Sequence, residues 1–131
     1  MSKASSTKNL TIFIAPNGFI EAHFTRTMTS VNIAWGVEEV TKMAKKIKAE
    51  NKPVLIIVSA SKVTSFGWAA QKAAVMAMRQ VPYNRVAIYG PISLQILLNT
   101  LSHVADSYNG VRAFSNRIEA LEWLRKDIIA K

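Results

Sequence analysis

The run Val54-Leu55-Ile56-Ile57-Val58, introduced by Pro53, decides the fold class of this chain. All five side chains are apolar, four of them are β-branched, and no polar residue alternates with them. Such a continuous run is typical of a strand that is covered on both faces. We therefore expect it to be the central strand of a sheet packed with helices.

Upstream of this run, the sequence predicts a hairpin followed by a helix. Residues 11–15 and 19–25 flank Pro16-Asn17-Gly18, a turn signal because Asn and Gly tolerate the positive φ of tight hairpins. Ser30 is a candidate N-cap for the helix. Beyond it, apolar residues recur at gaps of four and three and form one helical stripe: Ile33, Val37, Val40, Ala44 and Ile47.

Downstream, strands and helices alternate. The sequence predicts a helix over 68–80 ended by Pro82, a strand over 85–89, a third helix over 91–107, a strand over 111–114 and a last helix. Asn116, with Glu119 three residues later, resembles a capping box for that last helix. The order is ββαβαβαβα, so we expect an α/β fold: a single mixed, mostly parallel sheet with right-handed crossovers, packed with helices.

Composition sets the organisation of the chain. Its 131 residues, 50% of them hydrophobic, suit one domain over residues 10–131, preceded by a disordered tail over residues 1–9. Cysteine is absent, which excludes disulfides and thiolate sites. No apolar run is long enough to span a bilayer, and the first residues do not resemble a secretory signal, so we expect a cytoplasmic protein that is not transmembrane.

The sequence shows no recognisable reaction centre. His23 and His103 lack partners at metal-ligand spacing, and both are expected to be ordinary polar residues, His23 on a solvated hairpin face where it alternates with Phe19 and Glu21. Phosphate-binding glycine motifs and the GxSxG motif are also absent. We therefore expect no enzymatic activity, no metal and no cofactor. An enzyme would need Ser65, a histidine and a carboxylate to converge in the fold.

Two segments carry a family resemblance. The strand Val111-Arg112-Ala113-Phe114, followed by Glu119-Ala120-Leu121-Glu122-Trp123-Leu124, resembles the end of the STAS fold, and most closely its SpoIIAA-like branch. Arg85-Val86-Ala87-Ile88-Tyr89-Gly90 resembles the preceding strand of that branch. The resemblance covers residues 10–128 and implies a regulatory module that binds other proteins.

In anti-sigma-factor antagonists of this fold, a phosphorylatable serine lies in an Asp-Ser-x-Gly pattern in the loop before the second helix. The corresponding stretch here is Thr64-Ser65-Phe66-Gly67, so the resemblance assigns Ser65 as the phosphorylation site. Threonine replaces the aspartate of the pattern. A simpler role for Ser65 is to cap the helix that follows.

Charge and apolar surface suggest binding partners. The net charge is +9, and no acidic residue occurs between Glu50 and Asp106. We therefore expect an acidic protein partner. The predicted contact surface is the loop over 59–68 and the following helix, with contact residues Lys62, Ser65, Phe66, Trp68 and Lys72.

The sequence also bears on three other classes of partner: a second copy of the chain, a small ligand and a nucleic acid. The apolar third helix, extended by Trp68, Met76 and Met78, could be covered by a second copy of the chain in a homodimer. The alternative function is a binder or carrier of a lipid or another small apolar or anionic ligand, since the fold is also similar to CRAL-TRIO lipid-transfer domains. A nucleic acid is not favoured, because dense basic clusters interleaved with aromatic residues are missing.

Overall fold

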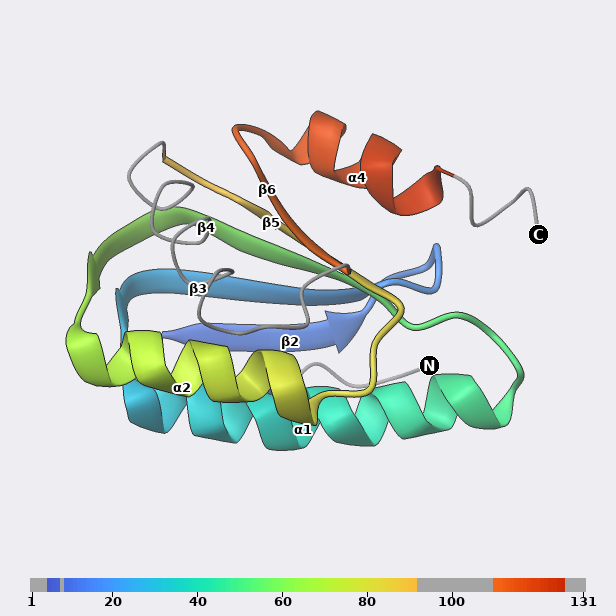
Figure 1. The fold of residues 1–131 in the computed structure, drawn as a ribbon, viewed down its shortest axis with the longest axis horizontal. Coiled ribbons are helices and arrows are strands. Elements are labelled where there is room, and N and C mark those ends of the chain that lie inside the picture. Colours follow the sequence, from blue (N-terminus) through green and yellow to red (C-terminus); the bar gives the residue numbers. More distant parts are fainter. Residues whose placement is uncertain (1–4, 8, 92–109, 127–131) are drawn as a thin grey trace.

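The computed structural model describes residues 5–7, 9–91 and 110–126 and contains one six-stranded sheet with helices on both faces (Figure 1). The elements are β1 (Ser5–Thr7), β2 (Leu10–Ile14), β3 (Ile20–Met28), α1 (Ser30–Ala49), β4 (Leu55–Phe66), α2 (Trp68–Gln80), β5 (Arg85–Tyr89), β6 (Val111–Phe114) and α4 (Arg117–Arg125). The α/β class is confirmed.

The strands lie in the sheet in the order in which they occur in the chain. β1, β2 and β3 pair antiparallel, and β3 to β6 pair parallel. β4 therefore lies inside the sheet, as its uninterrupted apolar run predicts. The helix expected over 91–107 falls almost wholly outside the described residues and stays a prediction.

One correction concerns the N-terminal segment. Residues 1–9 were expected to be a disordered tail, but Ser5–Thr7 form β1 and pair with Leu10 to Ile12 of β2. This segment is short and polar, so its sequence shows no alternation of apolar and polar residues that would predict a strand. It becomes a strand because the edge of β2 offers unpaired backbone N–H and C=O groups to which it can bond.

The hairpin is built as its turn residues predict. Gly18 has a φ of 90°, which a residue with a side chain rarely adopts. The Asn17 Oδ1 atom accepts a hydrogen bond from the Phe19 backbone N–H at 3.0 Å. Ala15 and Phe19 close the turn through a backbone hydrogen bond of 2.8 Å.

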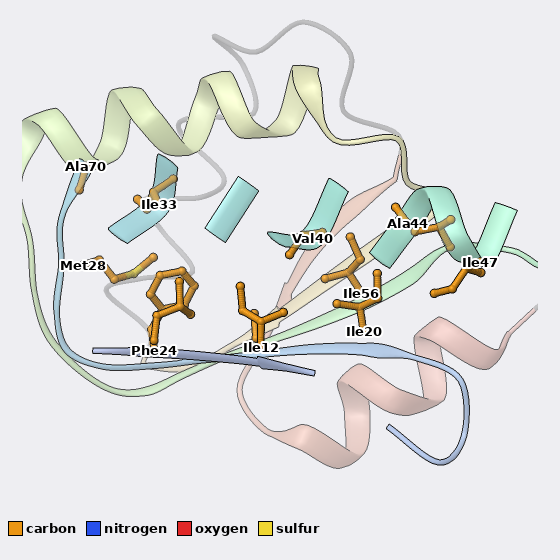
Figure 2. Close-up of a cluster of buried hydrophobic side chains, with 13 residues drawn as sticks. Ile12, Ile20, Phe24, Met28, Ile33, Val40, Ala44, Ile47, Ile56 and Ala70 are labelled. Carbon is orange, nitrogen blue, oxygen red and sulfur yellow. The ribbon is translucent and has the colours of Figure 1, made fainter. Parts of the chain in front are cut away.

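Helices α1 and α2 cover one face of the sheet over the larger core (Figure 2). The α1 stripe is confirmed: Ile33, Val40, Ala44 and Ile47 are buried, and Val37 is half-buried against them. The N-cap differs from the expectation. Thr29, not Ser30, is the cap residue, and its hydroxyl accepts a hydrogen bond from the Asn32 N–H at 3.0 Å.

Helix α4 covers the opposite face (Figure 1). Its buried Ala120 and Leu124 pack against Leu55 and Ile57 of β4. The predicted cap at Asn116 is confirmed, since its Oδ1 atom accepts a hydrogen bond from the Glu119 N–H at 3.0 Å. Side chains of the central strand thus enter two cores, and the sheet is covered on both faces as expected.

Candidate functional site

The candidate site lies where β3 and β4 end and two helices begin. β3 and β4 pair as far as Met28 and Phe66, their last residues. α1 begins two residues after Met28, and α2 begins two residues after Phe66. The first turns of both helices therefore lie at the same edge of the sheet, and the two helices pack against each other (Figure 1).

The outward face of α2 carries an exposed row of side chains. Trp68 is 73% exposed, Met76 is 50% exposed, and Lys72 between them is also exposed. Residues four apart in a helix are neighbours on one face, so these three form a continuous row along α2. We call Trp68, Lys72 and Met76 the α2 stripe.

The charge around the α2 stripe is one-sided. No acidic residue occurs in α2 or in the first turn of α1. Helix N-termini carry a partial positive charge from their unpaired N–H groups. Two such ends lie at this edge of the sheet, and Lys72 lies about one turn into α2, so the local field favours a negatively charged partner.

The predicted contact loop is largely a strand. β4 continues to Phe66, and Ser65 pairs with Thr27 of β3, so Ser65 and Phe66 lie at the end of a strand rather than in a loop. The side chains of Thr64, Ser65 and Phe66 lie outside the described part of the chain. The correction has a physical reason: β3 is long enough to offer ladder partners to the polar end of β4, with two irregularities in the register.

The remaining predicted residues lie on β4 and α2 or outside the described part of the chain. Ser65 is not the N-cap of α2, because that position is Gly67. Lys62 is exposed on β4 opposite Thr25. Trp68 and Lys72 lie on α2 as expected, and Met76 joins them as a residue that was predicted only as an extension of the apolar surface. The side chain of Met78 and the whole of His103 lie outside the described residues.

The structure also contains a polar cluster around Glu21 that the sequence did not predict. Glu21 was expected on a solvated hairpin face but is only 5% exposed, because α4 covers that face. Its two carboxylate oxygens accept hydrogen bonds from Arg117 of α4 at 2.9 and 2.8 Å. His23 Nε2 lies 2.9 Å from Glu21 Oε1, and the His23 ring stacks on Phe13 with centroids 5.5 Å apart.

This cluster is built to hold α4 on the sheet. The hydrogen bonds from Arg117 lower the pKa of Glu21, and Glu21 in turn raises the pKa of Arg117. A carboxylate that is saturated by a guanidinium is a poor base or nucleophile. Among the described residues, no group of three acidic or histidine side chains is placed to hold a metal ion.

An apolar cavity of about 140 Å³ lies between the sheet and helices α1 and α2. A carrier of a small ligand needs such a space, and a core without a cavity would argue against that function. The presence of the cavity is compatible with the alternative function of a ligand carrier.

Searches for related proteins identify the fold. No protein-family model and no curated protein match the sequence. Among solved structures, the chain is similar to an uncharacterised protein of the DUF3478 family from Shewanella loihica PV-4, which has a SpoIIAA-like fold. The match has a TM-score of 0.58 and 15% sequence identity, and covers 92% of this chain and 98% of that one.

The comparison confirms one prediction. The chain has the SpoIIAA-like fold that its closing strand and helix resemble. At this level of identity the likeness shows the fold alone, and the neighbour is itself uncharacterised. Separately, none of the helices that the structure describes has the length and apolar character needed to cross a membrane.

Proposed function

We propose that this domain is a non-enzymatic interaction module whose α2 stripe docks an acidic segment of a partner protein. The observation that carries the proposal is the exposure of Trp68 at the first residue of α2, where 73% of its surface meets solvent. Tryptophan is enriched among the residues that dominate binding energy, because it buries a large area with few rotatable bonds.

The stripe also specifies the chemistry of the partner. Lys72 lies between Trp68 and Met76, so an acidic side chain flanked by two apolar ones would match all three positions. The net charge of +9 attracts an acidic chain over a distance. Methionine adapts its shape to irregular partners, which suits the far end of the stripe.

Ser65 offers a means of regulation within this proposal. Its backbone lies three residues before Trp68, at the end of β4. Phosphorylation adds nearly two negative charges at neutral pH. Beside a surface that selects acidic partners, those charges would weaken docking. Ser65→Asp is therefore expected to reduce binding relative to Ser65→Ala.

The proposal is tested by placing a photo-crosslinking residue at Ala69, an exposed position beside Trp68 that leaves the α2 stripe intact, and, as a control, at Lys45 on the exposed side of α1. A protein captured at position 69 but not at position 45 is then purified and titrated with wild-type and variant domains. Trp68→Ala and Lys72→Glu are each expected to weaken binding at least about tenfold. Lys45→Glu changes the net charge equally and is expected to leave binding within about twofold.

Two results would contradict the proposal. One is equal binding by wild type, Trp68→Ala and Lys72→Glu. The other is a homodimer in sedimentation equilibrium that Trp68→Ala dissociates, because the stripe would then be covered by a second copy of this basic chain. Circular dichroism of each variant checks that a loss of binding is not caused by a loss of folding.

A second candidate function, the binding of a small apolar ligand, is favoured by a separate observation, the cavity beneath α2.

A further inference from the structure

The cavity lies on the inner side of α2, away from the α2 stripe. Its volume is about 140 Å³, and the described residues around it come from the sheet, α1 and α2. They include Phe24 and Val58 from the sheet and Ala74 and Ala77 from the inner face of α2. Small alanine side chains on α2 leave the space that larger residues would fill.

The lining is almost wholly apolar. Tyr83 is the only residue with a polar side chain among the described residues that line the cavity. Burial raises the pKa of Tyr83, which indicates that its hydroxyl is partly removed from water. A water molecule in a cavity needs two to four polar partners, and a single hydroxyl does not supply them. The space therefore favours an apolar occupant over water.

The size of the space limits the occupant. An apolar cavity of roughly 150 Å³ lined by Leu, Ile and Phe stays dry and accepts benzene or xenon. The space here has a similar volume, and its described lining is likewise apolar. No charged side chain is among the described lining residues, so an ionic group would lose its hydration without finding a counterion.

We propose that this cavity is a binding site for a small uncharged apolar molecule the size of a single aromatic ring or a short alkyl chain, with Tyr83 as the one residue with a polar side chain among the described lining residues. The site is independent of the proposed docking function, since the stripe and the cavity use opposite sides of α2. The proposal also restricts the alternative function: of the lipid, apolar and anionic ligands that the sequence left open, the apolar lining favours small uncharged ones.

The test uses benzene as the probe and methyl NMR as the readout. Benzene is titrated into the full chain, and the methyl signals of Val58, Val86 and Ile88, which line the cavity, are followed. The exposed methyls of Val31 and Ile118 serve as internal controls. We expect saturable shifts at the lining methyls and none at the controls. Benzoate, the charged analogue, is expected to bind at least tenfold more weakly.

A cavity-filling variant locates the site. Ala77→Leu places three additional carbons in the cavity and is expected to weaken benzene binding at least tenfold. Ala69→Leu makes the same change at an exposed position of the same helix and is the matched control. If Ala77→Leu does not fold, Ala74→Val provides a smaller filling at a second lining position.

Three results would overturn the proposal. The first is the absence of saturable shifts at the lining methyls of the wild type. The second is benzene binding by Ala77→Leu or Ala74→Val with wild-type affinity. The third is a set of NOEs showing that side chains from elsewhere in the chain, residues 92–109 included, fill the volume in solution.

Discussion

The carboxylate of Glu21 and the guanidinium of Arg117 form a two-pronged ion pair, with hydrogen bonds of 2.9 and 2.8 Å, across 96 residues of sequence. It joins β3 to the first residue of α4. Glu21 is buried, whereas the Arg117 side chain is 40% exposed. The pair thus fixes the start of α4 on the sheet from one side while its other side faces solvent.

The first prediction concerns this ion pair. Arg117→Met removes the cation and leaves the Glu21 carboxylate buried with His23 as its remaining described partner. We expect the free energy of unfolding to fall by about 2 kcal/mol, less than for a fully buried pair because Arg117 is partly solvated. Urea denaturation checks this value. Arg125→Met, at an exposed arginine of the same helix, is the control and is expected to cost less than about 0.5 kcal/mol. Equal losses in the two variants would contradict the prediction.

The second prediction concerns acid pH. Arg117 lowers the pKa of Glu21 in the folded state below its ordinary value of 4.5, so the unfolded chain takes up this proton first. The stabilisation is therefore complete above the unfolded pKa and is lost as pH falls through the lower, folded pKa. Without Arg117, burial raises the pKa of Glu21 in the variant, so the difference in unfolding free energy between wild type and Arg117→Met should be largest at pH 7 and should shrink steadily as the pH falls toward 3. A difference that is unchanged at pH 3 would show that the ion pair is not its source.

The elements that the sequence predicts best are those with long, regular apolar patterns. The run from Val54 to Val58 and the α1 stripe from Ile33 to Ile47 each specify one burial pattern, and the structure has both. A strand over Arg85 to Tyr89 is likewise confirmed. Such elements carry their own periodicity, so no knowledge of the tertiary partner is needed.

The errors occur where a distant element decides the outcome. Phe19, Glu21 and His23 alternate like a solvated strand face, and only the packing of α4 buries the first two. The polar end of β4 resembles a loop until β3 pairs with it. At the candidate site, Trp68 and Lys72 are exposed, and their role as a contact surface stays a prediction. Their alignment with Met76 follows from the position of α2 on the sheet, which local sequence does not determine.

The third prediction concerns the start of α1. The Thr29 hydroxyl accepts a hydrogen bond from the Asn32 N–H at 3.0 Å, whereas Ser30 is already within the helix. Thr29→Ala removes this cap and is expected to cost about 1 kcal/mol of unfolding free energy. Ser30→Ala, one residue later, is expected to be neutral or slightly stabilising, because alanine has the higher helix propensity. Thermal denaturation of the two variants side by side measures the difference. The reverse order of stability would mean that Ser30 is the cap in solution.

The fourth prediction concerns Gly110, which precedes β6. A Cβ at this position would lie 2.8 Å from the Asn84 carbonyl oxygen and 2.9 Å from Cε1 of Tyr83. Asn84 cannot move aside easily, because its side-chain oxygen and its backbone N–H both hydrogen-bond to Val54, at 2.7 and 2.9 Å. The Gly110 carbonyl is itself held by the Val86 N–H at 2.6 Å.

Gly110→Ala must therefore displace backbone that is fixed to the central strand, and we expect a loss of about 1–3 kcal/mol. Gly67→Ala is the matched control, since a Cβ there meets nothing within 4 Å. Alanine is a poorer helix cap than glycine, which destabilises the variant, but it also lowers the entropy of the unfolded chain, which stabilises it. The two effects oppose each other, so the free energy of unfolding should change by about 0.5 kcal/mol or less. Urea denaturation separates the two outcomes. If Gly110→Ala is as stable as Gly67→Ala, the loop before β5 yields more readily than its hydrogen bonds to Val54 indicate.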